Sequence, residues 1–461
     1  MTVSASDSSA AAARSQLGVV CALGATQTLA WASSTYLPAI LAAPIARDLG
    51  ISRATVFGAF SVSLLVMAVC GPLVGRAIDR AGGRNMLMWS NAVLAVGLML
   101  LGSAQSAAML FAAWCILGAG MAMGLYDAAF AALVRIYGTD ARKPITGITL
   151  IAGFASTVGW PMSAYMDAQI GWRAACYVWA ALHLVIALPI NWRLIPQVLP
   201  NRSDDAISRE SGGAAVPSAA ASLAAAAPAA PTAPTAPAPL ATTATVVQPG
   251  GDSRPPHSRR FDFVLLGIYF AATAFVTSAY ASHLPGLLAA LGAGAAGAVL
   301  AAALLGPAQV AARLVEFAVI SRYRVHALVT ARVATALHPL ACVVLGVFGG
   351  VALVSDAPAA YGAPVLLAAL FALLHGAGNG MITIAKGTLP LALFGAAGYG
   401  LTQGWLGVGA RIMQAGAPYA FGLVLDGAGG RVALLISALL SLLALAVLFM
   451  LRPALPAAAD G

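Results

Sequence analysis

Residues 71–84 read Gly71-Pro72-Leu73-Val74-Gly75-Arg76-Ala77-Ile78-Asp79-Arg80-Ala81-Gly82-Gly83-Arg84. This stretch closes one apolar segment with a short basic loop, and a second apolar segment follows it directly. Each apolar segment has about the 20 residues that a helix needs to cross the hydrocarbon core of a bilayer. The pattern therefore predicts two membrane helices joined by a tight, charged loop.

The rest of the chain repeats this pattern. Hydrophobic residues make up 61% and charged residues 8% of the 461 positions, which leaves too little polar surface for a water-soluble globule. Backbone groups in hydrocarbon must be hydrogen-bonded within their own segment, so the apolar segments are expected to be helices. We predict an all-α membrane protein of about 12 spans, near residues 17–38, 54–74, 86–104, 108–134, 145–166, 174–195, 261–282, 296–320, 327–350, 362–384, 400–424 and 432–451.

One long interruption divides these spans into two sets. Residues 196–260 carry a few charges and then an Ala/Pro/Thr/Ser tract. Such a tract has no apolar face to bury, so we expect a disordered linker there. It separates an N-terminal six-helix half at 17–195 from a C-terminal six-helix half at 261–451, between short tails at 1–16 and 452–461.

The distribution of lysine and arginine predicts the orientation. Most of these residues, including Lys143 and Lys386, fall in the loops and span ends on one side of the predicted helices, whereas the other side has Arg47, Arg53, Arg173 and Arg431. Because cytoplasmic loops collect positive charge, both termini and the linker are expected in the cytoplasm. We therefore expect a multi-pass protein of the cell membrane, with the bacterial inner membrane favoured.

The composition argues against several other classes of protein. The net charge of +9 is scattered over short loops instead of forming one basic patch, so nucleic acid is not an expected partner. The five cysteines lie in or beside apolar runs without a CxxC pair. There is no Walker loop, no HExxH sequence and no large soluble segment. We expect neither an enzyme, nor a cofactor, nor a metal site.

The two six-helix halves, the long linker and the loop at 71–84 together resemble the major facilitator superfamily. The signature loop of that family has the form G-x-L-x-G-R-x-x-D-R-x-G-(x)-R, and Gly71, Gly75, Asp79, Arg80 and Arg84 fit it. The resemblance covers nearly the whole chain outside the linker. It implies a secondary transporter that works by alternating access as a single chain, with a small-molecule substrate and a proton or counter-substrate as partners.

The same loop has a physical interpretation. Gly71 and Gly75 lie one helical turn apart, which lets a neighbouring helix approach closely. Asp79 and the flanking Arg76, Arg80 and Arg84 lie where the helix leaves the lipid. Charged groups there can pair with the end of a facing helix and act as a gating latch. The alternative interpretation is that the arginines only anchor the helix on the cytoplasmic side.

Ionisable residues inside the spans are the main candidates for substrate contact, because charge in the bilayer is costly. Arg313 in the eighth span and Arg411 in the eleventh are the strongest candidates. Two guanidinium groups facing one cavity form a receptor for a carboxylate or another oxyanion. Glu316 lies three residues beyond Arg313 and is expected to be its charge partner. Alternatively, Arg313 and Glu316 form a structural pair and Arg411 extends to a carbonyl group or to the membrane surface.

The placement of these two arginines resembles that in oxalate/formate antiporters, and an eighth-span arginine near an acidic residue is also similar to monocarboxylate transporters. The first span reads Gly24-Ala25-Thr26-Gln27-Thr28-Leu29-Ala30-Trp31. It therefore lacks the acidic-Gly-Gly-Trp start that is typical of the monocarboxylate subfamily.

Further polar residues in the spans are candidates for the cavity wall. His375 and Asn379 lie four residues apart in the tenth span, where His375 is either a substrate or proton group or a packed histidine. Asp127 in the fourth span either carries a proton or pairs with an arginine such as Arg135. The polar first span adds Gln27, Trp31 and Tyr36 as substrate contacts.

The sequence therefore favours a transporter of a small, carboxylate-like organic anion. A proton-coupled antiporter that exports drugs or toxic compounds is the main alternative. The fourth-span stretch at 114–120 lacks the arginine that such exporters usually carry, and the stretch at 158–163 only partly resembles their fifth-span pattern. A membrane sensor built on a carrier fold is a third possibility, although the linker has no sequence features of an ordered signalling domain.

Overall fold

The computed structural model describes residues 5–198, 256–323, 325–348 and 363–451. Every regular element in these ranges is a helix, and the described residues contain no strand. This confirms the predicted all-α class. Most of the predicted linker, at 199–255, and the C-terminal tail at 452–461 lie outside the described residues.

The N-terminal half contains α1 (Ala5–Ser33), α2 (Leu37–Leu49), α3 (Arg53–Ala81), α4 (Gly83–Gly102), α5 (Ala107–Gly124), α6 (Tyr126–Tyr137), η1 (Gly138–Ala141), α7 (Arg142–Ala152), α8 (Ala155–Leu182), η2 (His183–Ala187) and α9 (Leu188–Leu194). The C-terminal half contains α11 (Pro256–Leu288), η3 (Ala289–Ala293), α12 (Ala295–Ala303), α13 (Leu305–Tyr323), α14 (Ala327–Val343), η4 (Val344–Phe348), α16 (Ala363–Phe394) and α17 (Tyr399–Met450).

Nine helical stretches within the described residues are long and apolar enough to cross a membrane. Two of them contain more than one crossing. The stretch Ala107–Leu194 covers three of the predicted spans, and Tyr399–Met450 covers two. Gly171 and Gly429 interrupt these stretches with φ angles of 79° and 83°, which a residue with a side chain rarely adopts. The helical stretches therefore match the 12 or so predicted spans.

The first helix differs from the prediction at its start. Helix α1 begins at Ala5, inside the predicted tail at 1–16, whereas the part with membrane-spanning hydropathy begins at Gln16. The helix therefore extends about three turns beyond the apolar segment. Hydropathy marks where lipid begins, but it does not mark where helical hydrogen bonding ends.

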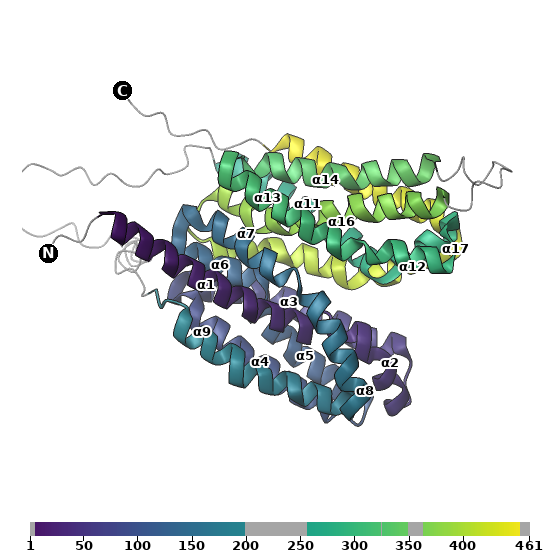
Figure 1. Ribbon diagram of the computed structural model, residues 1–461, viewed down its shortest axis with the longest axis horizontal. Coiled ribbons are helices and arrows are strands. Elements are labelled where there is room, and N and C mark those ends of the chain that lie inside the picture. Colours follow the sequence, from purple (N-terminus) through teal and green to yellow (C-terminus); the bar gives the residue numbers. More distant parts are fainter. Residues whose placement is uncertain (1–4, 199–255, 324, 349–362, 452–461) are drawn as a thin grey trace, which may run out of the picture.

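The helices form two bundles, coloured purple to blue for the N-terminal half and green to yellow for the C-terminal half (Figure 1). The bundles meet at the end where α1 begins and α9 ends, and they diverge toward the end that carries α2, α8 and α12 (Figure 1). The predicted orientation assigns the end where they meet to the cytoplasm. The contacts that hold this end together are therefore candidates for a gate.

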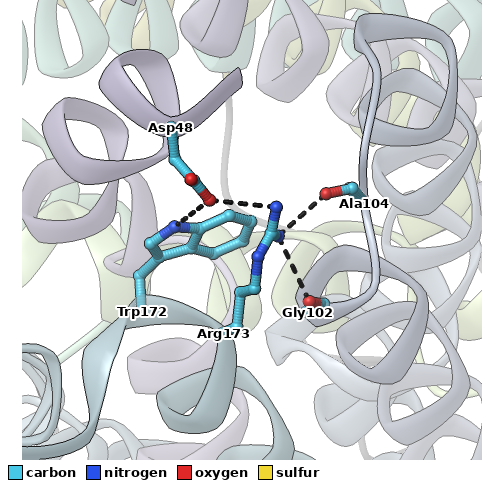
Figure 2. Close-up of polar contacts among 5 residues, drawn as sticks. All are labelled: Asp48, Gly102, Ala104, Trp172 and Arg173. Carbon is cyan, nitrogen blue, oxygen red and sulfur yellow. Dashed lines mark hydrogen bonds and ion pairs between the residues drawn. The ribbon is translucent and has the colours of Figure 1, made fainter. Parts of the chain in front are cut away.

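A polar cluster fixes the opposite end of the N-terminal half (Figure 2). The Asp48 carboxylate at the end of α2 pairs with Arg173 Nη2 at 2.9 Å and accepts a hydrogen bond from Trp172 Nε1 at 3.0 Å. Arg173 Nη1 donates to the carbonyl oxygens of Gly102 and Ala104 at 3.4 and 2.8 Å. One arginine thus joins α2, the connection between α4 and α5, and α8.

Candidate functional site

Asp79 on α3 binds the first turn of α17. Its Oδ1 accepts a hydrogen bond from the Gly400 backbone N–H at 2.8 Å, and its Oδ2 accepts one from the Leu401 N–H at 2.8 Å. The N-terminus of a helix carries partial positive charge and has unpaired N–H groups. A carboxylate there is therefore stabilised both by the helix dipole and by hydrogen bonds. Asp79 also interacts electrostatically with Arg135 of the same half. The hydrogen bonds from Gly400 and Leu401 to Asp79 join the two halves at the end where the bundles meet.

Glycines allow α3 and α17 to approach this closely. A methyl group built on Gly71 would lie 3.4 Å from the Gly404 oxygen, and one on Gly404 would lie 2.6 Å from the Gly71 oxygen. A methyl group on Gly75 would overlap the Gly400 oxygen. The pair Gly71 and Gly75 thus faces a matching pair, Gly400 and Gly404. The second pair was missed by the sequence analysis, although its four-residue spacing is visible in the chain.

The arginines of the loop do not share the Asp79 contact. Arg76 and Arg80 are exposed. Arg84 is partly buried, and its Nε has no hydrogen-bond partner among the described residues. Of the charged residues expected to act together in the loop, Asp79 therefore binds the facing helix α17, and the arginines do not.

Asp127 and Arg411 form an ion pair between the halves. Asp127 Oδ2 on α6 lies 2.9 Å from Arg411 Nη2 on α17, and the two side chains are 27% and 14% exposed. Gln403 donates to Asp127 Oδ1 at 3.2 Å, and Arg411 Nη1 donates to Gln414 Oε1 at 2.8 Å. For Asp127 the sequence left open a proton role or an arginine partner such as Arg135. The partner in the structure is Arg411.

Arg313 on α13 lies between α16 and α7. It is 5% exposed, and its Nε donates to the Gly380 oxygen at 3.2 Å and its Nη2 to Thr383 Oγ1 at 3.4 Å. A methyl group on Gly153 of α7 would overlap Arg313 Nη1, so this guanidinium reaches the N-terminal half. Nη1 makes no hydrogen bond to a described residue and is not fully enclosed. Arg313 therefore has donor capacity left for a bound anion.

The expected ion pair between Glu316 and Arg313 is not formed, which corrects the sequence prediction. Glu316 is 5% exposed, and neither carboxylate oxygen has a hydrogen-bond partner among the described residues. Its electrostatic partners are Arg142 of α7 first and Arg313 second. The reason is that two nitrogens of the Arg313 guanidinium donate to Gly380 and Thr383 of α16 instead.

Lys386 is a site residue that the sequence analysis missed. It was assigned to the cytoplasmic loops, but it lies within α16, partly buried, where it interacts electrostatically with Asp127 and Arg411. Asn379, Thr383 and Lys386 follow one another at spacings of four and three residues, so they share one face of α16. This spacing could have indicated Lys386 from the sequence. It was overlooked because the predicted tenth span ended at residue 384, two residues before Lys386.

His375 and Asn379 both face α11 but differ in burial. His375 is 3% exposed inside the C-terminal half, where its Nδ1 lies 2.7 Å from His338 Nδ1 and its ring is 4.8 Å from that of Tyr280. Asn379 is partly exposed and accepts a hydrogen bond from Thr277 Oγ1 at 2.9 Å. The structure thus matches the packed-histidine alternative for His375 and leaves Asn379 beside the interface.

The first span contributes an aromatic wall. The Trp31 ring lies 4.9 Å from that of Tyr126 and 6.0 Å from that of Tyr36, and Tyr36 lies 5.8 Å from Trp160. Arg313 interacts electrostatically with Tyr36 and Tyr126, so the wall belongs to the same region. Two of the first-span candidates, Trp31 and Tyr36, are therefore near a cation.

Gln27, the third first-span candidate, is buried within the N-terminal half. It is 1% exposed, and its side-chain amide donates to the carbonyl oxygen of Gly124, where α5 ends. This contact satisfies one backbone oxygen at the break between α5 and α6. In the structure Gln27 is therefore a buried packing residue of the N-terminal half.

A small cleft connects the Asp127–Arg411 pair with the glycine contact. It is lined by Met67, Gly71, Val74, Gly75, Ala122, Asp127, Ala128, Gly400, Gly404, Gly407 and Arg411. The ion pair and the gate contact therefore belong to one continuous region between the halves.

Comparison with known proteins identifies the family. The sequence profile described as Major Facilitator Superfamily matches residues 23–366. The chain belongs to the major facilitator superfamily. No curated protein matches the chain.

Solved structures of other major facilitator proteins share the fold. The human organic anion transporter MFSD10 is 16% identical with a TM-score of 0.58, and the match covers 94% of this chain and 99% of that one. The proton:xylose symporter XylE, bound to 6-bromo-6-deoxy-D-glucose, is 12% identical with a TM-score of 0.64, and the match covers 96% of each chain. At such low identity the likeness concerns the fold, which supports a multi-pass membrane protein and secondary transport in general.

Proposed function

We propose that this major facilitator protein transports a small organic anion by alternating access. The observation that carries the proposal is the charge at the interface. Arg313, Lys386 and Arg411 lie there with two nearby acidic residues, Asp127 and Glu316, and Glu316 interacts first with a fourth cation, Arg142 of α7. Positive charge without a counter-charge is costly in a membrane protein, and a bound anion offsets that cost. The aromatic wall of Trp31 and Tyr36 offers a surface for the uncharged part of the solute.

The two structural relatives do not decide the substrate. One is described as an organic anion transporter and the other as a proton:xylose symporter, and both share this fold. The choice between an anion and a neutral solute therefore rests on the side chains of this chain. A sugar site needs neutral hydrogen-bonding groups, whereas three cations favour carboxylate or another oxyanion.

The gate in this proposal is the contact between α3 and α17. Binding of Asp79 to the N-terminus of α17, with the facing glycines, holds the cytoplasmic end closed while the other end is open. Rocking of the halves about the central site would break this contact and expose the site to the cytoplasm. The arginines of the loop then serve as membrane-surface anchors beside the gate.

The test is anion binding and counterflow with the purified protein. Liposomes loaded with a carboxylate are expected to accumulate the labelled carboxylate, and Arg313→Gln is expected to weaken binding by about 10- to 100-fold, the loss typical of one charge-assisted hydrogen bond. Arg322→Gln, at an exposed position on α13, is the matched control. Equal loss in the control would point to a general effect of charge on the protein.

The alternative is a proton-coupled exporter of drugs or toxic compounds. In that case lipophilic cations should stabilise the protein against heat, and Arg313→Gln should leave that stabilisation unchanged. Asp127, an acidic group inside the interface, would then be the proton carrier. Stabilisation by lipophilic cations without any response to carboxylates would reject the anion proposal.

A further inference from the structure

Glu316 on α13 is a buried carboxyl group to which the proposed function gives no role. The residue is 5% exposed, and neither carboxyl oxygen has a hydrogen-bond partner among the described residues. An ionised carboxylate that is buried without hydrogen bonds is very costly, and the neutral acid is much less so. The surroundings of Glu316 therefore favour the protonated carboxyl group.

Glu316 lies where the two halves meet, along the contact between α13 and α7. On one side of it Arg313 reaches α7, where a methyl group on Gly153 would overlap its guanidinium. On the other side Arg142, at the start of α7, donates to the carbonyl oxygen of Val325, between α13 and α14. Glu316 follows Arg313 by about one helical turn, so it lies between these two contacts, inside the closed cytoplasmic end.

The two arginines near Glu316 donate to neutral oxygens instead of to its carboxyl group. Arg142 Nη2 donates to Thr330 Oγ1 at 3.5 Å. Arg313 Nη2 donates to Thr383 Oγ1 at 3.4 Å. A hydrogen bond between two charged groups is about twice as strong as one between neutral groups, so an ionised Glu316 should attract one of these guanidiniums away from a hydroxyl. The observed partners therefore fit a neutral Glu316.

The helices around α13 supply few other titratable groups to Glu316. Its electrostatic partners are Arg142 first and Arg313 second, and it also interacts with Tyr269 of α11. Helix α12 contains no titratable residue. The part of α16 that binds Arg313 contributes a backbone oxygen and a hydroxyl group. The charge on Glu316 is therefore set by the two arginines and by its burial.

The other titratable groups of the interface have partners of their own. On α16, His375 bonds another histidine of the C-terminal half, and Lys386 interacts electrostatically with Asp127 and Arg411. The Asp127 oxygens accept hydrogen bonds from Arg411 at 2.9 Å and from a glutamine of α17 at 3.2 Å. Asp127 is thus stabilised as an ionised carboxylate, whereas Glu316 is not.

We propose that Glu316 carries a proton that is coupled to transport. It binds the proton from the outer aqueous phase while the cytoplasmic end is closed, and it releases the proton to the cytoplasm when α7 and α13 separate. Separation of these helices admits water, which stabilises the carboxylate. This inference rests on the proposed function, because it names the coupling ion of the same transport cycle.

The same group links proton binding to anion binding. A neutral Glu316 leaves a more positive potential at Arg313, with which it interacts electrostatically, than an ionised Glu316 does. A proton on Glu316 and an anion beside Arg313 therefore favour each other's binding. Proton and anion are then expected to cross the membrane in the same direction.

The first test observes the proton on Glu316 directly. The sequence contains two glutamates, Glu210 and Glu316. The full chain with Glu210→Gln, made by cell-free synthesis with glutamate labelled with carbon-13 at Cδ, reports on Glu316 alone. In lipid nanodiscs at pH 7 the labelled carbon is expected to have the NMR shift of a protonated acid. The shift of an ionised carboxylate at pH 7, with titration near the ordinary glutamate value of about 4.3, would overturn the proposal.

The second test measures transport of labelled pyruvate and labelled succinate in liposomes. With acid outside, the wild-type protein is expected to accumulate a transported monoanion by about tenfold per pH unit for one coupled proton. Glu316→Gln does not titrate, so it should retain counterflow and lose this accumulation. Asp140→Asn, which removes an exposed carboxylate just before α7, is the matched control and should retain both.

The outcomes separate this inference from the proposed function. Counterflow by the wild-type protein without any response to the pH gradient would reject proton coupling and leave anion transport standing. Accumulation that persists in Glu316→Gln would assign the proton to another group. If neither carboxylate is transported, the proposed function fails for these solutes. The NMR titration needs no solute and leaves Glu316 intact, so it still decides whether Glu316 holds a proton.

Discussion

The Asp127 carboxylate on α6 lies 2.9 Å from the Arg411 guanidinium on α17, so an ion pair joins the two halves within the membrane-spanning region. The chain separates these residues by 284 positions. Both side chains are mostly buried, so solvent screens the pair less than it screens a pair at the surface. The pair therefore contributes to the contact between the two halves.

The first prediction concerns this pair. Arg411→Gln and Asp127→Asn each leave one charge without its partner, and each is expected to cost about 1–3 kcal/mol of stability. The double variant should lose less than the sum of the two, because the unpaired charge is removed. Chemical unfolding of all four proteins in mixed micelles gives the coupling energy. Additive losses would mean that the pair makes no net contribution.

The second prediction concerns the glycine contact. Gly75→Ala places a methyl group against the Gly400 oxygen, so it should push α3 from α17 and open the cytoplasmic end. Spin labels at the exposed positions 81 and 322, in a variant without native cysteines, should report longer distances. Gly58→Ala on the same helix is the control, because nothing lies within 4 Å of the added methyl group. Unchanged distances in Gly75→Ala would reject the gate contact.

The third prediction concerns the carboxylate at the helix end. Asp79→Asn keeps one acceptor oxygen but loses the negative charge that the N-terminus of α17 favours, and we expect a loss of about 1 kcal/mol. The labelled positions of the previous experiment should also move apart in a fraction of the molecules. Arg80→Gln, at the exposed neighbouring position, should leave both measurements unchanged. A larger effect of Arg80→Gln would assign the latch to the arginine.

The fourth prediction concerns pH. His326 lies just before α14, where its Nδ1 accepts a hydrogen bond from the Leu328 N–H at 3.2 Å. Burial lowers the pKa of His326 below its usual value, and Arg142 and Arg332 lower it further. Because the pKa of His326 is lower in the folded protein than in the unfolded chain, protonation of the ring favours the unfolded chain. The stability that the neutral ring provides is therefore present above pH about 6.5 and is lost as the pH falls below that value.

Thermal unfolding at pH 7.5 and pH 5.5 checks this expectation. His326→Asn keeps a side-chain acceptor at the start of α14 but does not titrate. The wild-type protein should therefore lose more stability on acidification than the variant does. An equal loss in both proteins would show that other groups cause the pH dependence.

The spans were predictable because hydropathy is a property of each segment by itself. Apolar length fixes where a helix crosses the bilayer, and the stretch at 196–260, which has no apolar segment, separates the first six predicted spans from the last six. The spacing of Gly71 and Gly75 also predicts a face that another helix approaches. The helix that approaches it, with Gly400 and Gly404, was not predictable from that spacing.

The site was predicted less well than the fold. Arg313 and Arg411 do lie at the interface, because charge inside a span is expensive enough to indicate a special position. Glu316 interacts electrostatically with Arg313 but forms no ion pair with it, since a shared helix face permits a direct contact but does not require it. Lys386 was assigned to the cytoplasmic loops and span ends, and the role of His375 was left open, because spacing along one helix does not say which neighbouring helix a side chain meets.

The sequence by itself determined that this chain is a helical membrane protein of the major facilitator superfamily, through apolar length, the linker and the loop at 71–84. Only the tertiary structure decided that Asp79 binds the end of α17, that Asp127 pairs with Arg411 and that Lys386 faces the interface. The physical reason is that burial in lipid depends on local composition, whereas pairing depends on the rotation and depth of each helix against all the others.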